Sequence, residues 1–147
     1  MYDIGVMGVK IKDIMSNSVL SADSGQSVCE VARMMREHDV GAVPVFERDV
    51  IAGIVTDRDI VMRCVAAGKS PSECSAGEIM SGGAVSVTPN QSVADAAKIM
   101  AAVKIRRLPV IEDGRLVGML SFGDIARSRT DGAEISEAIS EISTPFQ

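Results

Sequence analysis

Apolar residues recur at helical spacing in two stretches of the chain, each directly after a serine. They occupy positions 28, 31, 32 and 35 in the first stretch and positions 93, 96, 97 and 100 in the second. This i, i+3, i+4, i+7 pattern predicts a helix with one buried face. Ser27 and Ser92 each precede an acidic residue by three positions, which is the spacing of a capping box, so each helix is expected to begin there.

A β-hairpin is predicted after each of these helices. The first joins Val43–Phe46 to Val50–Val55, and the second joins Leu108–Ile111 to Leu116–Leu120. The runs are rich in β-branched and other apolar residues, and short polar turns of the Asp-Gly type separate them, as is typical of hairpins.

The two halves of the chain are copies of each other at an offset of 65 residues. From Ile14 to Ile60, 15 of 47 positions are identical to their counterparts without a gap. A unit of about 50 residues buries too little surface to be stable alone, so the two copies are expected to pack together. The repeat predicts domain boundaries: a first repeat with a short lead (1–68), a linker (69–75), a second repeat (76–127) and a C-terminal tail (128–147).

Each copy is predicted to follow the order β-α-β-β-α. The short first strand is expected near Val19–Leu20 in one copy and at Val85–Val87 in the other, and the second helices open at Thr56 and Ser121. In the tail, apolar residues at positions 135, 138, 139 and 142 predict an accessory amphipathic helix.

The composition of the chain argues against several classes of function. The formal net charge of −5, the absence of Trp and the single Tyr argue against binding to nucleic acid or to an anionic membrane surface. No apolar run approaches the ~20 residues of a membrane span, and the chain does not open like a signal peptide, so we expect a cytoplasmic protein. Cys29, Cys64 and Cys74 lack C-x-x-C spacing, which favours buried thiols in a reducing compartment over a redox switch.

One motif occurs twice, at the predicted junction of the last strand and the second helix. Gly53–Asp59 and Gly118–Asp124 both read Gly-apolar-apolar-Thr/Ser-x-x-Asp, and each follows an apolar-Pro-Val sequence. In these residues the chain resembles a tandem pair of cystathionine-β-synthase (CBS) domains over residues 10–127, as in stand-alone bacterial and archaeal CBS proteins. The resemblance implies an α/β (α+β) fold in which the sheets of the two repeats pack about a pseudo-two-fold axis.

The resemblance also implies two clefts for an adenosine-containing ligand such as AMP, ADP, ATP or S-adenosylmethionine, with no other cofactor required. Asp59 and Asp124 are then expected to hold ribose hydroxyls, and Thr56 and Ser121 to face ribose or phosphate. The residues themselves allow a second interpretation, because Thr/Ser-x-x-Asp at a helix start also caps backbone N–H groups without any ligand.

The repeats differ in basic residues near the motif. Arg106 and Arg107 suit a phosphate, although solvated surface arginines explain them as well, and the sequence does not assign them to one cleft. The first repeat has no such pair, and Arg58 is its nearest basic candidate, for which a surface charge is the alternative explanation. The remaining candidates are apolar residues expected beside the adenine, for which core packing is the alternative explanation: Val19, Val43, Ala84 and Leu108.

Two functions are compatible with these features. The first is a regulatory module that binds an adenosyl ligand and changes its conformation or its interaction with an unidentified protein partner, and the second is a ligand-free dimeric scaffold. An enzyme is not expected, because the sequence has one His, no Gly-rich phosphate loop and no grouping of metal ligands. We expect a homodimer, since helices rich in Ala, Val, Ile and Met would leave apolar surface on a monomer.

Overall fold

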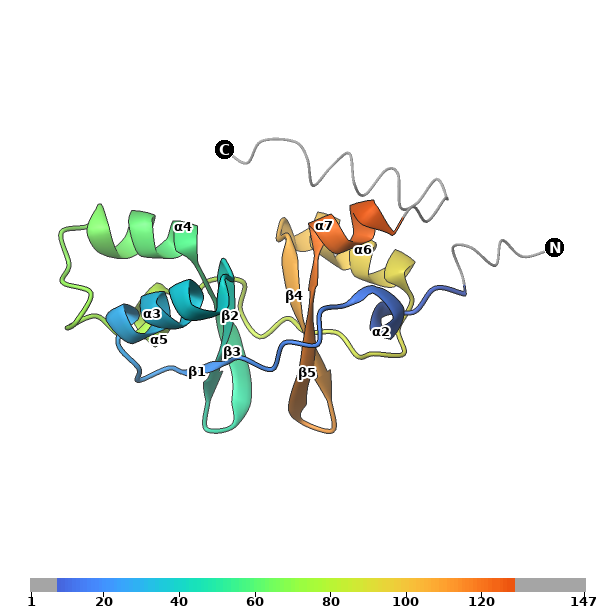
Figure 1. Cartoon of the computed structure of the whole chain (residues 1–147), viewed down its shortest axis with the longest axis horizontal. Coiled ribbons are helices and arrows are strands. Elements are labelled where there is room, and N and C mark those ends of the chain that lie inside the picture. Colours follow the sequence, from blue (N-terminus) through green and yellow to red (C-terminus); the bar gives the residue numbers. More distant parts are fainter. Residues whose placement is uncertain (1–7, 129–147) are drawn as a thin grey trace. The chain divides into compact units, whose positions relative to one another are not determined.

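The computed structural model describes residues 8–128, which form two compact units. Unit 2 comprises residues 20–85, and unit 1 combines residues 8–19 with residues 86–128. Each unit is built on an antiparallel hairpin, and its longer helices lie on one face of that hairpin (Figure 1). The predicted α+β class with two β-α-β-β-α copies is confirmed in outline.

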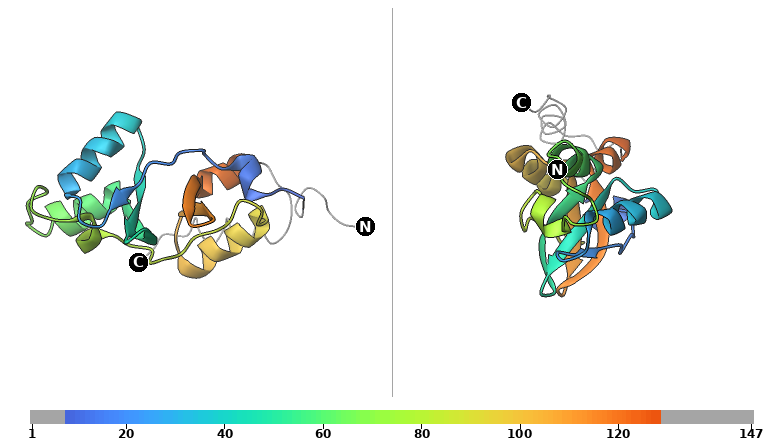
Figure 2. Two further views of the ribbon diagram at one scale, coloured as in Figure 1. Left: turned by 90° about the horizontal axis from the view of Figure 1, so that it is seen from below. Right: turned by 90° about the vertical axis from the view of Figure 1, so that its left-hand side faces the viewer.

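In unit 2, a three-stranded sheet of order β1-β2-β3 carries the helices, and α3 and α4 lie on the same side of it in both views (Figures 1 and 2). The elements are β1 (Ala22–Asp23), α3 (Val28–His38), β2 (Ala42–Glu47), β3 (Val50–Thr56), α4 (Asp57–Asp59), the π-helical η1 (Ile60–Val65) and α5 (Ala76–Ile79).

In unit 1, the sheet has two strands. The elements are α2 (Ile11–Ile14), α6 (Val93–Val103), β4 (Arg107–Glu112), β5 (Arg115–Ser121) and α7 (Phe122–Arg127). The predicted long helices and hairpins therefore occur in both units. The predicted amphipathic helix of the tail lies outside the described residues.

Of the two short first strands, the one in unit 2 was predicted at the wrong position, whereas the one in unit 1 falls within the predicted residues. In unit 2 the strand is Ala22–Asp23, because the buried Ala22 pairs in parallel with Val45, whereas Val19 is 64% exposed. In unit 1 the predicted strand is reduced to one bridge between Val87 and Val110.

The long helices begin at the predicted serines. Ser27 Oγ accepts the backbone N–H of Glu30 at 3.1 Å, and Ser92 Oγ accepts the backbone N–H of Asp95 at 3.0 Å. Each hydroxyl satisfies one N–H group that has no partner within its helix, which fixes the start of α3 and of α6.

The leading segment of each repeat packs in the unit that holds the other repeat. Ile11 of α2 is fully buried in unit 1, and its N–H donates to the Gln91 carbonyl at 2.9 Å. Ile79 of α5 is fully buried in unit 2, where the N–H of Ala76 donates to the Gln26 carbonyl at 2.8 Å. The compact units are thus not the same segments as the sequence repeats.

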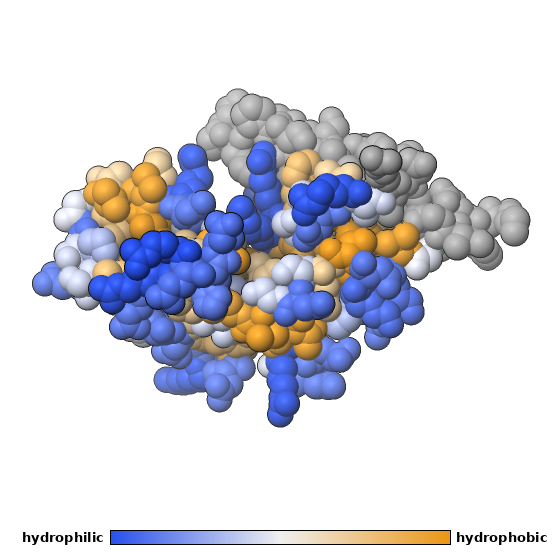
Figure 3. Space-filling model, viewed as in Figure 1, coloured by the Kyte–Doolittle hydropathy of each residue, from blue (hydrophilic) through white to orange (hydrophobic). Residues whose placement is uncertain are grey.

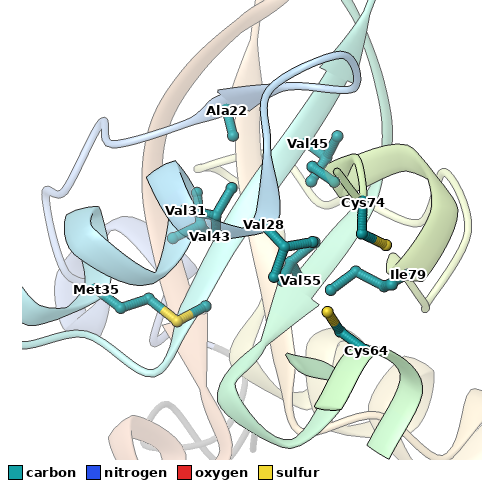
Figure 4. Packing of buried hydrophobic residues seen from close by; sticks show 11 residues of the cluster. Ala22, Val28, Val31, Met35, Val43, Val45, Val55, Cys64, Cys74 and Ile79 are labelled. Carbon is teal, nitrogen blue, oxygen red and sulfur yellow. The ribbon is translucent and has the colours of Figure 1, made fainter. Parts of the chain in front are cut away.

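The residues predicted as a linker are part of unit 2. The carbonyls of Pro71 and Cys74 accept the N–H groups of Cys29 at 3.0 Å and Val28 at 2.8 Å, so this segment caps the start of α3. Cys74 is buried in the core together with Cys64, and both thiols lie beside Ile79 (Figure 4).

Burial raises the pKa of the Cys74 thiol to about 11, and its hydrogen bond to Glu78 at 3.3 Å acts in the same direction. A thiol in this state is protonated and unreactive near neutral pH. The prediction of buried, apolar cysteines is confirmed for Cys64 and Cys74, whereas Cys29 is half-buried.

Candidate ligand-binding site

The motif of unit 2 closes a reciprocal cap at the end of β3. Thr56 Oγ1 accepts the N–H of Asp59 at 3.1 Å, and Asp59 Oδ2 accepts the N–H of Thr56 at 2.9 Å. Among residues 8–128, Asp59 alone is both charged and buried, with 8% exposure. The capping hydrogen bonds that the motif predicts are therefore present, and they account for one of the two carboxylate oxygens.

Two further residues surround the Asp59 carboxylate. The Ser81 hydroxyl donates to Oδ2 at 3.0 Å, while Arg63 Nε lies 3.8 Å from Oδ1, too far for a hydrogen bond. Arg63 is turned toward the backbone, where Nη1 donates to the Met80 carbonyl at 3.1 Å. Within the described residues no buried side-chain oxygen lacks a hydrogen-bond partner, so Oδ1 is in contact with solvent.

The motif of unit 1 has the same cap but a different second partner. Ser121 Oγ accepts the N–H of Asp124 at 3.0 Å, and Asp124 Oδ2 accepts the N–H of Ser121 at 2.9 Å. Arg127 Nη2 donates to the other oxygen, Oδ1, at 2.8 Å. The guanidinium lies across Gly123, where a Cβ atom would stand 3.1 Å from Arg127 Nη1.

Arg106 and Arg107 lie in unit 1, at the end of the hairpin that carries the Asp124 motif. Arg107 is opposite Ser121 across β4 and β5. The Arg106 guanidinium carbon is 5.8 Å from the centre of the Phe122 ring, a cation–π distance, and the Arg106 carbonyl accepts the Phe122 N–H at 2.7 Å. Two cationic side chains therefore flank the Ser121–Asp124 cap.

At the corresponding place in unit 2, the Gly41 carbonyl accepts the N–H of Asp57 at 3.0 Å, and Ala42 is opposite Thr56. Arg58 is exposed, and its N–H donates to Asp57 Oδ1 at 2.8 Å. The two motifs thus make the same backbone hydrogen bond and strand pairing, but Arg106 and Arg107 have uncharged counterparts, Gly41 and Ala42, in unit 2.

The four apolar candidates fall into two groups by burial. Val43 and Leu108 are fully buried, which agrees with core packing as the alternative explanation for both. Val19 and Ala84 are exposed and lie outside any strand, so they do not form the strand positions on which their selection depended.

Three residues at these carboxylates were missed from the sequence: Ser81, Arg63 and Arg127. Ser81 was visible as an identity of the repeat with Ser16, but a hydroxyl 22 residues from Asp59 shows no local signal. Arg127 stands three residues after Asp124, a spacing at which helical side chains meet, and could have been found from that spacing.

Residues 8–128 contain neither a candidate metal site nor a candidate membrane-spanning helix. No group of three or more His, Cys, Asp or Glu side chains there is placed to hold a metal ion. In the same residues, no helix has the length and apolar character that crossing a membrane requires.

Known proteins resemble the chain over most of its length. The CBS domain model matches residues 11–66 and 76–131. The CBS domain-containing protein YhcV of Bacillus subtilis is 38% identical over 90% of this chain and 94% of its own length. Hypoxic response protein 1 of Mycobacterium tuberculosis is 36% identical over 92% of this chain and 94% of its own.

Solved structures agree with the sequence comparisons. The crystal structure of Hypoxic Response Protein I, with two coordinated zinc ions, has a TM-score of 0.72 at 38% identity and covers 81% of this chain and 98% of its own. A hexameric CBS-CP12 protein from bloom-forming cyanobacteria has a TM-score of 0.75 at 31% identity, over 82% of this chain and 72% of its own. The chain belongs to the CBS domain family, with two CBS domains in tandem.

Proposed function

We propose that the chain is a regulatory module that binds an adenosine-containing ligand, namely AMP, ADP, ATP or S-adenosylmethionine. In this proposal Asp59 and Asp124 accept hydrogen bonds from ribose hydroxyls, and Thr56 and Ser121 face ribose or phosphate. Ligand binding then changes the conformation of the chain or its interaction with a protein partner. The proposed setting is the cytoplasm, which the three free cysteines support.

The Asp59 carboxylate is the observation that carries this proposal. A helix cap needs one acceptor oxygen, and Asp59 Oδ2 supplies it. Burying the charge of the whole carboxylate is unfavourable unless its other oxygen also has a partner. Oδ1 accepts no hydrogen bond from the described residues; it is in contact with solvent and forms an ion pair with Arg63, whose Nε lies 3.8 Å away. A carboxylate oxygen held in this way can accept hydrogen bonds from the two neighbouring hydroxyls of a ribose.

A thermal shift experiment tests the proposal. AMP, ADP, ATP, S-adenosylmethionine and NAD are added to the purified chain in turn, with 2′-deoxyAMP as a ligand that lacks one ribose hydroxyl. At 100 times its Kd a ligand stabilises the folded state by about 2.7 kcal/mol, which raises the melting temperature by about 5 °C or more.

At least one ribonucleotide or S-adenosylmethionine is expected to produce this shift, and 2′-deoxyAMP a smaller shift than AMP. A melting temperature that none of the compounds changes would contradict the proposal and favour the ligand-free scaffold.

A second proposed function is self-association, and one exposed surface favours it. Val61, Met62 and Val65 on η1 are each more than half exposed, and Figure 3 shows apolar surface over this part of unit 2. Adjacent exposed apolar side chains of this kind mark interaction surfaces. Oligomers occur among the structural relatives, as in the hexameric CBS-CP12 protein. We propose that η1 contributes to a homodimer contact.

Light scattering tests this second proposal. The wild-type chain is expected to exceed its monomer mass of 15.5 kDa at micromolar concentration, and Met62→Asp to shift it toward that mass. Val50→Asp is the matched control, since Val50 is also exposed but lies on β3, away from η1. A wild-type chain that is monomeric, or a Met62→Asp variant that associates like the control, would contradict the role of η1.

A further inference from the structure

The two motif carboxylates differ in what occupies their second oxygen. Asp59 and Asp124 are counterparts in the repeat, and in both the Oδ2 atom serves the cap. Oδ1 of Asp59 accepts no hydrogen bond from the described residues, whereas Oδ1 of Asp124 accepts one from Arg127 at 2.8 Å. In unit 1, therefore, the atom that a ribose needs is already bonded to a side chain of the same helix.

Asp59 also has an arginine near its Oδ1 atom, but Arg63 Nε lies 3.8 Å away and forms an ion pair without a hydrogen bond. The repeat comparison shows why only unit 1 has the hydrogen-bonded pair. The counterpart of Arg127 in unit 2 is Met62, which cannot donate to a carboxylate. The counterpart of Gly123 is Arg58. A side chain at position 123 would stand close to the Arg127 guanidinium, so glycine leaves the space in which Arg127 reaches back to Asp124.

The ion pair is weak enough to be displaced. The Arg127 side chain is 73% exposed, and an exposed pair on one helix changes an equilibrium constant by about five-fold at most. Arg127 therefore competes with a ligand for the Asp124 Oδ1 atom, and a ligand can displace it.

The charges around Asp124 indicate which ligand displaces Arg127 most readily. Arg106 lies on Phe122 and Arg107 is opposite Ser121, so three arginines belong to this end of unit 1. A guanidinium that leaves a carboxylate gains most from a phosphate, which accepts the same paired hydrogen bonds. In unit 2 the position of Phe122 is taken by Asp57, whose charge disfavours a phosphate.

We infer that Arg127 is a specificity-determining residue of the Asp124 site. Its guanidinium donates to the Asp124 oxygen that must accept hydrogen bonds from the ribose hydroxyls. When a ligand carries a phosphate, the guanidinium moves to the phosphate and leaves that oxygen to the ribose. Unphosphorylated adenosine is consequently disfavoured at Asp124 and favoured at Asp59. The inference rests on the proposed binding of adenosyl ligands.

Arg127→Met tests the inference, because it installs the residue that unit 2 has at this position. Arg115→Met is the matched control, since Arg115 is exposed at the far end of the same hairpin. Adenosine and AMP are titrated by calorimetry into wild type and both variants. Methionine-methyl NMR assigns each binding event, with Met119 reporting on unit 1 and Met80 on unit 2.

Arg127→Met is expected to strengthen adenosine binding in unit 1 by about two- to five-fold, because the competitor is gone. AMP is expected to lose at least ten-fold of its preference over adenosine there, because a charge-assisted contact to phosphate is gone. In Arg127→Met, the binding that Met80 reports in unit 2 is expected to stay as in wild type. The control Arg115→Met is expected to bind both compounds as wild type does. Unchanged adenosine affinity in unit 1, or equal changes for adenosine and AMP, would overturn the inference while leaving the proposed function intact. No binding of either compound to any of the proteins would overturn both.

Discussion

Gly118→Ala is expected to destabilise unit 1 strongly, because the backbone of another segment lies where the new methyl group would be. A Cβ at Gly118 would overlap the carbonyl oxygen of Ser16 and stand 2.9 Å from Met15 Sδ. Ser16 and Met119 exchange two backbone hydrogen bonds at this point, of 2.8 and 2.9 Å. The methyl group can be accommodated only if this bridge opens.

The decrease in the free energy of unfolding of Gly118→Ala can be worked out from the two Ser16–Met119 hydrogen bonds that break. Two backbone hydrogen bonds are worth about 1 kcal/mol each, and displacement of Met15 adds a packing loss, so we expect a decrease of about 2–4 kcal/mol in the free energy of unfolding. Gly53→Ala should have a smaller effect, since the nearest atoms, Ser81 O and Met80 Sδ, are both 3.0 Å from its Cβ position.

Urea unfolding followed by circular dichroism measures these differences, as the chain has no Trp for fluorescence. Gly25→Ala is the control, because its Cβ would meet only the exposed Asp23 side chain, at 3.3 Å. From the most to the least stable, the variants are expected to rank Gly25→Ala, Gly53→Ala and Gly118→Ala. A Gly118→Ala variant within about 0.5 kcal/mol of wild type would refute the reasoning.

Three further outcomes follow from the same structure. Asp59→Ala should lower the free energy of unfolding by about 2 kcal/mol, and Asp124→Ala should lower it by about 1 kcal/mol. The Asp59 carboxylate accepts hydrogen bonds from a backbone N–H and a hydroxyl, whereas the Asp124 carboxylate accepts from a backbone N–H and an exposed arginine. Equal decreases for the two variants in urea unfolding would contradict this expectation. Ser92→Ala should remove a helix cap at a cost of about 1 kcal/mol, and an unchanged unfolding midpoint would count against that cap. The native Cys74 thiol keeps its proton up to a pKa of about 11, whereas an unfolded thiol loses it near pH 8.5, so stability should fall as the pH rises between these values. A Cys74→Ala variant should show a smaller fall, and an identical pH profile would contradict the assignment.

Local chemistry made much of the fold predictable. The helix starts at Ser27 and Ser92 follow from hydrogen bonds that span three residues, and the hairpins follow from apolar runs with a polar turn between them. The capping role of the Asp59 motif is local for the same reason.

Long-range contacts decided the features that the sequence did not predict. The bridge between Ser16 and Met119 joins segments about a hundred residues apart, and no periodicity reports it. The Ser81 hydroxyl reaches Asp59 only because α5 packs in unit 2. The first strand of unit 2 lies at Ala22 and not near Val19 because parallel pairing with Val45 selects the register.

Titration calorimetry of AMP into wild type and Asp59→Asn tests the central claim most directly. The amide oxygen of Asn can keep the cap with Thr56 and Ser81, while its NH₂ group replaces the free acceptor oxygen with a donor. The variant is therefore expected to unfold close to the wild-type temperature and to lose AMP affinity by at least ten-fold at that site. AMP that binds Asp59→Asn as tightly as wild type, or that binds neither protein, would contradict the assignment of Asp59 as a ribose acceptor.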